Sequence, residues 1–236
     1  MAQARTDRMQ PIVAWRALMQ LIDDPEDTPK VFEIVRALGG PSIERGFRRF
    51  RTTDVGRRVL ERDVDLLDTL KDREALTRLP ANSFGHAYYN FTEAEMLSAD
   101  GLVDASEGHT EQFEDPQLGR YAARLRDMHD LWHTLTQYGR DELGEACLLA
   151  FTYAQTHNRG IALIIVVGGF KIRQDVGPGV FRALFRAYRD GRRAAWLPAQ
   201  DFEALLALPI GEVRKRLGIT EPIPYRALRA GVAATA

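Results

Sequence analysis

Apolar residues recur at helical spacing along most of the chain, and this pattern predicts a protein made of helices. In residues 54–70, five apolar side chains fall on one broad helical face, so an amphipathic helix is expected there. Residues 24–40 begin with Asp and Pro start signals and stop at a glycine pair, which is typical of a helix with marked ends. The same periodicity predicts helical segments at residues 11–24, 181–196 and 199–219.

The middle of the chain predicts two long helices that are separated by a glycine. The first covers residues 118–138 and ends at Gly139, and the second begins at Asp141, which is suited to an N-cap. The run ALIIVV at residues 162–167 is the one β-rich stretch, and a strand or a buried helix explains it equally well. We therefore expect an all-α fold.

Composition indicates the class of protein, an ordinary globular domain, but not its function. The 236 residues are 45% hydrophobic and 28% charged, as in ordinary soluble domains, and contain no internal repeat, so we expect a single helical domain over residues 1–236. The net charge of −1 gives no field that would favour nucleic acid as a partner. The single cysteine, Cys147, excludes an internal disulfide and a multi-cysteine zinc site, and it suits a reducing cytoplasm.

Membrane insertion is not expected from the sequence. The N-terminal residues lack the apolar core of a signal peptide. The longest apolar run, at residues 160–169, is far shorter than the roughly 20 residues that a spanning helix needs.

The clearest chemical pattern is the stretch HDLWHTLTQYGRDELGE at residues 129–145. On a helix, His129 and His133 are separated by about 40°, so both imidazoles can reach one ion. Asp130 lies about 60° from His133 on the same helix, where it could bind the ion or orient a ligand. If the chain reverses at Gly139, Glu145 comes beside His133, because each is six residues from the glycine.

Two interpretations of this stretch remain open on spacing alone. Two imidazoles with carboxylates suit a divalent metal such as zinc, iron, manganese or cobalt, and the sequence does not choose among them. Histidines four residues apart also occur by chance, and Arg126 with Asp130 is explained by a surface ion pair worth about 0.3–0.5 kcal/mol.

Further residues connect the pattern to a known family. The stretch RLRDMHDLWH, followed by eleven residues and Glu145, resembles the HDxxHx11E signature of the coenzyme Q biosynthesis family that is numbered fourth in the yeast nomenclature. The resemblance extends to TTDVGRRVL at residues 52–60, LPANSFGHAYYNF at 79–91 and DFEALLALPIGEVRKRLGITEPIPY at 201–225.

The resemblance implies specific roles for site residues. It implies an all-helical fold with a lipid channel and a metal site between adjacent helices. Arg124 and Arg126 match two arginines before the signature, and would bind an anionic head group. By the same resemblance, the residues that bind the divalent metal and carry the catalysis are His129, Asp130, His133 and Glu145.

The resemblance also implies a function in ubiquinone biosynthesis. The favoured activity is the metal-dependent oxidative decarboxylation of a prenylated hydroxybenzoate. The alternative is a non-catalytic prenyl-lipid-binding scaffold that organises the other enzymes of the pathway. The expected partners are a prenylated aromatic lipid, the other ubiquinone biosynthesis proteins and a membrane surface, with a homodimer left open. The expected location is cytoplasmic and peripheral to the inner membrane.

Two basic segments bear on the membrane interpretation. In residues 180–193, aromatic and apolar residues form one stripe that arginines flank, which is typical of an interfacial helix. A surface helix that packs its stripe into the core explains this segment equally well. Residues 42–58 form a second basic patch, which suits anionic head groups or a solvated face.

Overall fold

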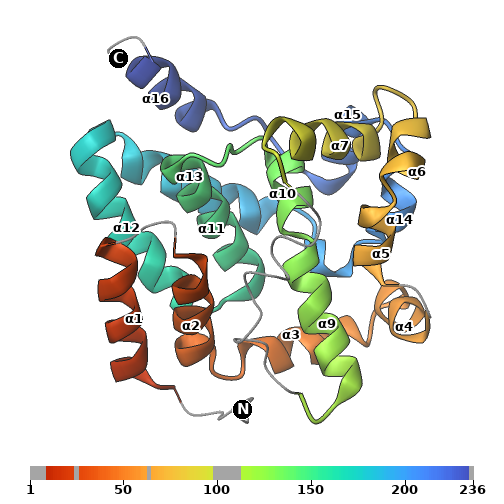
Figure 1. The fold of residues 1–236 in the computed structure, drawn as a ribbon, viewed down its shortest axis with the longest axis horizontal. Coiled ribbons are helices and arrows are strands. Elements are labelled where there is room, and N and C mark those ends of the chain that lie inside the picture. The colour runs from red at the N-terminus through yellow and green to blue at the C-terminus, as the bar shows by residue number, and fades with distance from the viewer. Residues whose placement is uncertain (1–8, 24–26, 63–64, 98–112, 234–236) are drawn as a thin grey trace. The chain divides into compact units, whose positions relative to one another are not determined.

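The computed structural model describes residues 9–23, 27–62, 65–97 and 113–233 (Figure 1). These residues form helices joined by short connections and contain no strand, apart from an isolated β-bridge between Ser83 and Pro209. The predicted all-α class is therefore confirmed. The helices are α1 (Pro11–Asp23), α2 (Thr28–Gly39), α3 (Ser42–Phe50), α4 (Asp54–Glu61), α5 (Leu66–Lys71), α6 (Arg73–Arg78), α7 (Phe84–Ala94), α9 (Pro116–Asp127), α10 (His129–Thr136), α11 (Glu142–Thr156), α12 (Arg159–Val176), α13 (Val180–Arg193), η1 (Leu197–Ala199), α14 (Phe202–Leu205), α15 (Ile210–Leu217) and α16 (Ile223–Ala233).

The helices divide into two compact units, each assembled from segments that are distant in the sequence. Unit 1 is built from the described parts of Ile43–Leu135 and Ala195–Gly218. Unit 2 is built from the described parts of Asp7–Ser42, Thr136–Ala194 and Ile219–Ala236. Because the segments interleave, neither unit can be cut from the chain as one continuous piece. The expectation of a single domain remains a prediction.

In unit 1, an aromatic core joins α3, α4 and α9. Phe47, Phe50, Val59 and Tyr121 are buried together, and the Phe50 and Tyr121 ring centroids lie 5.0 Å apart. The start of α4 requires a glycine, because a Cβ on Gly56 would lie 1.9 Å from the backbone oxygen of Phe50. Gly56 is therefore needed for the close packing of α4 against the end of α3.

In unit 2, an apolar cluster lies among α1, α2 and α12, which lie next to one another in Figure 1. A Cβ on Gly160 would lie 2.5 Å from the backbone oxygen of Ile34, so α12 approaches α2 closely at its start. The cluster of buried residues consists of Ala14, Ala17, Leu18, Ile34, Ala37 and Ile164. The small alanine side chains permit this close approach of the helices.

The C-terminal helix of unit 2 holds the connection that precedes α11. The Tyr225 hydroxyl donates a hydrogen bond to Asp141 Oδ2 at 2.6 Å and accepts one from the Gly139 N–H at 2.9 Å. Arg229 forms an ion pair with the same carboxylate. Asp141 Oδ1 also accepts from the Gly144 N–H at 3.2 Å, so the predicted N-cap is confirmed. One aspartate thus starts α11 and binds α16.

The helices decide three predictions from the sequence. Residues 162–167 lie inside α12, so the helix interpretation is correct, although Ile164 is buried and Val166 is 52% exposed. The helix expected over residues 54–70 is two helices, because a new one begins at the capping box of Asp65. In α13, Leu184 is buried but Phe185 is 61% exposed, so the stripe packs inward only in part. Within the described residues, no helix is both long and apolar enough to cross a membrane.

Candidate metal centre

The two predicted ligand histidines lie on α10, directly after α9. The Met128 N–H donates to the Arg124 oxygen at 3.1 Å, and the Trp132 N–H donates to the Met128 oxygen at 3.0 Å. The helix predicted over residues 118–138 is therefore nearly continuous, with one interruption at Met128. This connection keeps His129 and His133 one turn apart on the same helix, as the sequence spacing requires.

The structure brings His129, Asp130 and His133 together in unit 1. The Nε2 atoms of the two histidines lie 3.1 Å apart, and their rings meet edge to face with centroids 4.7 Å apart. One potential ligand atom from each of the three residues lies within 4.8 Å of the others. Three of the four predicted metal ligands therefore form one cluster.

The donor set of this cluster fits a divalent cation. With metal–nitrogen bonds of about 2.0–2.1 Å, neighbouring ligand atoms stand roughly 3.0–3.4 Å apart, and opposite ones about 4.2 Å. The separation of the two imidazole nitrogens lies in the first range. All three ligand atoms lie within 4.8 Å of one another, which is near the second value. The same nitrogen contact also allows a hydrogen bond when one imidazole carries its proton on Nε2.

The cluster lies at the edge of the buried interior of unit 1. His133 is 1% exposed and Asp130 is buried, whereas His129 is partly exposed. The Phe91 ring of α7 stacks on the His133 imidazole, with centroids 5.6 Å apart and planes 19° apart. Tyr88, one turn earlier, is buried, and burial together with the charge of Asp130 raises the pKa of its phenol. The site is therefore walled by aromatic rings on the α7 side.

Arg214 of α15 fixes the C-terminal end of the histidine helix. Its Nε donates to the Leu135 oxygen and its Nη2 to the Thr134 oxygen, each at 2.9 Å. These carbonyls would otherwise lack partners at a helix end, and a cation there also favours the helix dipole. Sequence reasoning missed Phe91 and Arg214, because neither is close to the histidines in the chain. The signals were that Phe91 ends one segment similar to the family and that Arg214 lies inside another.

The fourth predicted ligand, Glu145, belongs to unit 2. It lies in the first turn of α11, and its Oε1 is 3.6 Å from Arg140 Nε. Its inclusion in the metal site remains a prediction.

The two arginines assigned to an anionic head group have partners within the protein. Arg124 is 3% exposed, and its Nη1 and Nη2 donate to the two carboxylate oxygens of Glu203 at 2.7 and 2.8 Å. Its Nη2 also donates to the Gln200 oxygen at 3.1 Å. Arg126 forms an ion pair with Asp127 at 2.9 Å. A head group at Arg124 would have to compete with a bidentate carboxylate, so Arg126 is the more available of the two.

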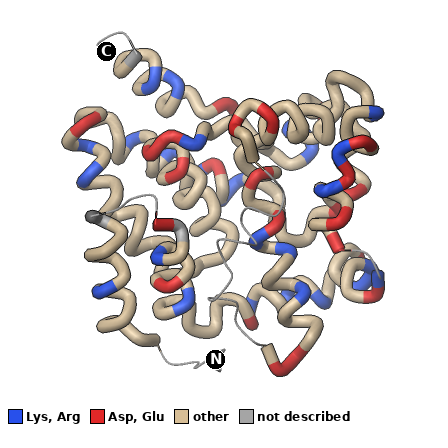
Figure 2. Tube along the Cα trace, in the orientation of Figure 1, with Lys and Arg blue, Asp and Glu red and all other residues tan. Residues whose placement is uncertain are grey.

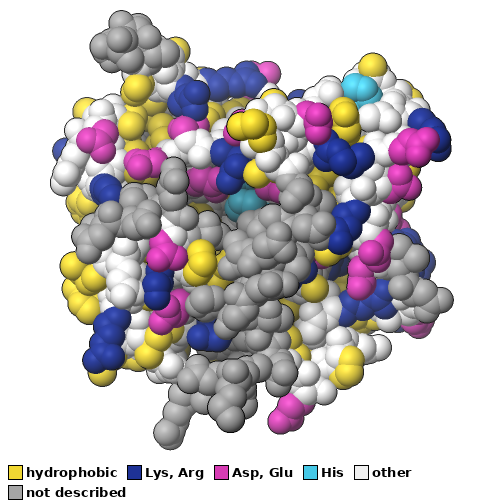
Figure 3. All heavy atoms as spheres, viewed as in Figure 1, with side chains coloured by type: hydrophobic (Ala, Val, Ile, Leu, Met, Phe, Trp, Pro, Cys, Tyr) yellow, Lys and Arg dark blue, Asp and Glu magenta, His cyan; other side chains and the backbone are white. Residues whose placement is uncertain are grey.

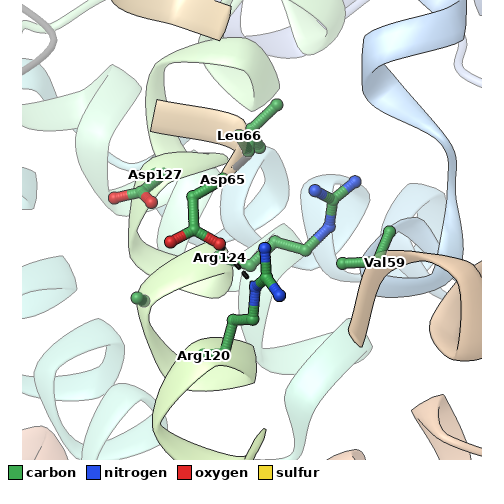
Figure 4. Close-up of a pocket in the computed structure, with 7 residues that line it drawn as sticks. Val59, Asp65, Leu66, Arg120, Arg124 and Asp127 are labelled. Atoms are coloured by element: carbon green, nitrogen blue, oxygen red, sulfur yellow. Dashed lines mark hydrogen bonds and ion pairs between the residues drawn. The ribbon is translucent and has the colours of Figure 1, made fainter. Parts of the chain in front are cut away.

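A small pocket in unit 1 lies beside these charges (Figure 4). Arg120 Nε donates to Asp65 at 2.6 Å across it, and burial raises the pKa of Asp127 although Arg126 opposes the shift. The pocket is very small and four of its seven lining residues are charged, so it does not provide the apolar channel that a prenyl tail requires. The lining residues are Val59, Asp65, Leu66, Arg120, Ala123, Arg124 and Asp127.

Unit 2 presents exposed apolar residues on α1. Ile12, Trp15 and Met19 are 70%, 58% and 43% exposed, and their spacing places them on one face of the helix. Hydrophobic side chains are visible along α1 in Figure 3. Figure 2 shows both signs of charge spread along the helices, which agrees with the net charge near zero. The exposed stripe is therefore apolar rather than part of a large charged surface.

Comparison with known proteins relates this chain to a family. Residues 5–223 match the family described as "Coenzyme Q (ubiquinone) biosynthesis protein Coq4". The chain is 28% identical over 200 residues to the ubiquinone biosynthesis protein COQ4 homolog, mitochondrial, of Aedes aegypti, covering 83% of this chain and 70% of that protein. It is 29% identical over 180 residues to the ubiquinone biosynthesis protein COQ4, mitochondrial, of Podospora anserina, covering 75% and 58%. This chain therefore spans less than two thirds of the Podospora protein.

The fold also resembles a solved structure. A crystal structure of a Nostoc punctiforme protein, whose name connects it with ubiquinone biosynthesis, superposes with a TM-score of 0.59. The two share 21% sequence identity, and the match covers 91% of this chain and all of the other. This likeness supports the helical fold.

Proposed function

The chain belongs to the coenzyme Q (ubiquinone) biosynthesis protein Coq4 family, and on this premise we propose that it acts in ubiquinone biosynthesis as a metal-dependent enzyme. The substrate class is a prenylated hydroxybenzoate, and the reaction is its oxidative decarboxylation. The observation that carries the proposal is the cluster of His129, Asp130 and His133, with two imidazole nitrogens 3.1 Å apart.

The side chains of the cluster have distinct tasks in this proposal. His129 and His133 would hold the ion through the lone pairs of Nε2, so each imidazole carries its proton on Nδ1. Asp130 contributes negative charge to the cation, and the rings on the α7 side exclude water from His133. Glu145 is proposed as the fourth ligand, and Arg126 as the contact for an anionic group of the substrate.

The reaction replaces a ring carboxylate by a hydroxyl group. The bond between the ring and the carboxylate carbon breaks, carbon dioxide leaves, and a ring–oxygen bond forms. With water as the oxygen source, this change releases two electrons and one proton, so a two-electron acceptor must accompany the substrate. A bound divalent ion would supply positive charge that stabilises the ring carboxylate or phenolate during this change.

The test begins with metal content, measured by mass spectrometry on the full chain after reconstitution with zinc, iron, manganese or cobalt. We expect about one ion per chain in the wild type and a loss of at least about 10²-fold in affinity in His133→Ala. The matched control is His86→Ala, because His86 lies on α7 and bonds to Asn90 rather than to the cluster. A His133→Ala protein that loses the ion but still converts substrate at the wild-type rate would show that the metal mechanism is wrong.

A second candidate function is a non-catalytic scaffold that binds prenyl lipid and organises other ubiquinone biosynthesis proteins at a membrane surface. The observation that favours it is the exposed apolar stripe of Ile12, Trp15 and Met19 in unit 2. Product formation by the purified, metal-loaded chain separates the two functions. Binding of prenylated lipid without turnover under any of the four metals would favour the scaffold. Peripheral attachment to the inner membrane is part of both proposals.

A further inference from the structure

We propose that Phe91 is a positioning residue that fixes the plane of the His133 imidazole, the plane in which its Nε2 can meet that of His129. This inference rests on the proposed function, because His133 is one of the residues that would hold the ion. In this role the Phe91 ring acts only as a flat surface against the imidazole, and it does not contact the substrate.

The backbone around His133 does not by itself set the plane of its ring. Arg214 donates to the carbonyls of Thr134 and Leu135, the two residues after His133, and thereby fixes the backbone at this end of α10. Helix geometry then restricts the first side-chain torsion. The second torsion, which turns the imidazole plane, has a broad energy minimum in histidine. Neither the helix nor Arg214 therefore decides where Nε2 points.

Phe91 restricts this second torsion. Its ring lies nearly parallel to the imidazole, with planes 19° apart and centroids 5.6 Å apart, which is within the range of offset stacking. A rotation of the imidazole about its second torsion would drive the ring edge into this face. The stacked orientation is also the one in which the two Nε2 atoms lie 3.1 Å apart. The aromatic contact and the ligand geometry thus select the same orientation.

The position of Phe91 is itself well determined. Phe91 comes one turn after Tyr88, which is buried, on a helix capped by the Ser83 hydroxyl. Thr92, the next residue, is buried and donates through its hydroxyl to the Tyr89 oxygen at 3.0 Å. The stacking surface is therefore held by an ordered helix.

The first experiment needs no metal. In the full chain with ¹³C-labelled histidine, we would measure NMR contacts between the ring protons of His129 and His133. We expect these contacts in the wild type and in Phe91→Tyr, and their loss in Phe91→Leu, which keeps an apolar side chain but removes the flat face. The matched control is Tyr89→Leu, because Tyr89 is an aromatic residue on α7 whose ring contacts are with His86 and Arg73. If Phe91→Leu fails to fold, Phe91→Met serves in its place.

The second experiment titrates zinc chloride and cobalt chloride into the same proteins. We expect Phe91→Leu to bind about 10-fold more weakly, as is common when a partner that orients a ligand is removed, and Phe91→Tyr to restore the affinity. Unchanged ring contacts in Phe91→Leu would overturn the positioning role even if the wild type bound no metal. Intact metal binding by the wild type with equal affinity in Phe91→Leu would overturn it while leaving the proposed function in place.

Discussion

The two units differ in what they bury and what they expose. Among the described residues, five side chains of the acidic, basic and histidine types are buried, and Asp190 is the member that lies in unit 2. The other four, Arg124, Asp127, Asp130 and His133, lie on α9 and α10 in unit 1. Exposed large hydrophobic side chains show the opposite distribution. Of the ten among the described residues, Met96 lies in unit 1 and the other nine lie in unit 2.

This difference indicates a chemical site in unit 1 and a contact surface in unit 2. Burying ionisable groups costs free energy unless they are paired, so their concentration in unit 1 indicates a region shaped for binding or catalysis. Exposed apolar residues gathered on a few helices indicate a surface that another molecule covers. In unit 2 these residues lie on or next to α1, α12, α13 and α16. We therefore expect substitutions in unit 1 to affect stability and the site, and substitutions on the exposed face of unit 2 to affect association.

The largest expected effect is in unit 1, at the buried pair of Arg124 and Glu203. Arg124→Met keeps the apolar stem but leaves the Glu203 carboxylate without its bidentate partner. Arg62 remains 3.3 Å from Glu203, so we expect a loss of about 3 kcal/mol, the low end of the range for a broken buried pair. Urea denaturation measures the loss. The double variant with Glu203→Gln should recover part of it, and full stability in Arg124→Met alone would contradict a structural role for this arginine.

An intermediate effect is expected in unit 2, where Tyr225 joins α16 to the start of α11. Tyr225→Phe removes the hydrogen bond to Asp141 and the partner of the Gly139 N–H, so we expect a loss of about 1–2 kcal/mol near neutral pH. Tyr225→Phe should leave metal binding by the histidines of unit 1 within about twofold of the wild type. A larger change in metal affinity would weaken the separation between the units.

The same tyrosine predicts a pH dependence. Burial, together with the hydrogen bond to Asp141, raises the pKa of Tyr225 to about 12, above the value of about 10 for an unfolded tyrosine. Its contribution to stability is therefore complete below about pH 10 and is lost as the pH rises toward 12. Denaturation at about pH 8 and about pH 11 should show a smaller alkaline loss in Tyr225→Phe than in the wild type. An equal loss in both proteins would assign the alkaline effect to other groups.

The smallest effect on stability is expected on the exposed face of α1. Trp15→Gln should change the free energy of unfolding by less than about 0.5 kcal/mol, because the side chain is 58% exposed. It should nevertheless weaken binding to vesicles of anionic phospholipid, measured by flotation. Gln20→Ser, a polar change at an exposed position of α1, is the control. A Trp15 variant that floats like the wild type would show that this face does not contact lipid.

Much of the fold was readable from local signals. The stop at Gly39 and Gly40 and the start at Asp141 were predicted because caps and glycines act within a few residues of a helix end. The break between α4 and α5 was missed, because apolar periodicity continues across it. For α13, the sequence left open whether the apolar stripe packs into the core or faces a membrane. Burial of such a stripe depends on helices that are distant in the sequence.

In the site, too, local contacts were predicted and contacts between distant segments were not. The pairing of His129 with His133 follows from one helical turn, so the sequence predicted it. The bonds from Arg214 to this helix span about 80 residues and were beyond any spacing argument. Arg124 was assigned to a head group by resemblance, and its carboxylate partner on α14 could be found only in three dimensions.

Two of the three tryptophans give the unmodified protein contrasting optical signals. Trp132 lies on α10 between the two histidines and is 3% exposed, whereas Trp15 is largely in solvent. A buried indole emits at shorter wavelength than a solvated one, so the two contributions differ in colour. Cobalt or manganese at the cluster should quench the blue component, and a partner that covers α1 should shift the red one. Occupancy of the cluster and of the outer face of α1 can thus be followed in one fluorescence titration, without a dye or a tag.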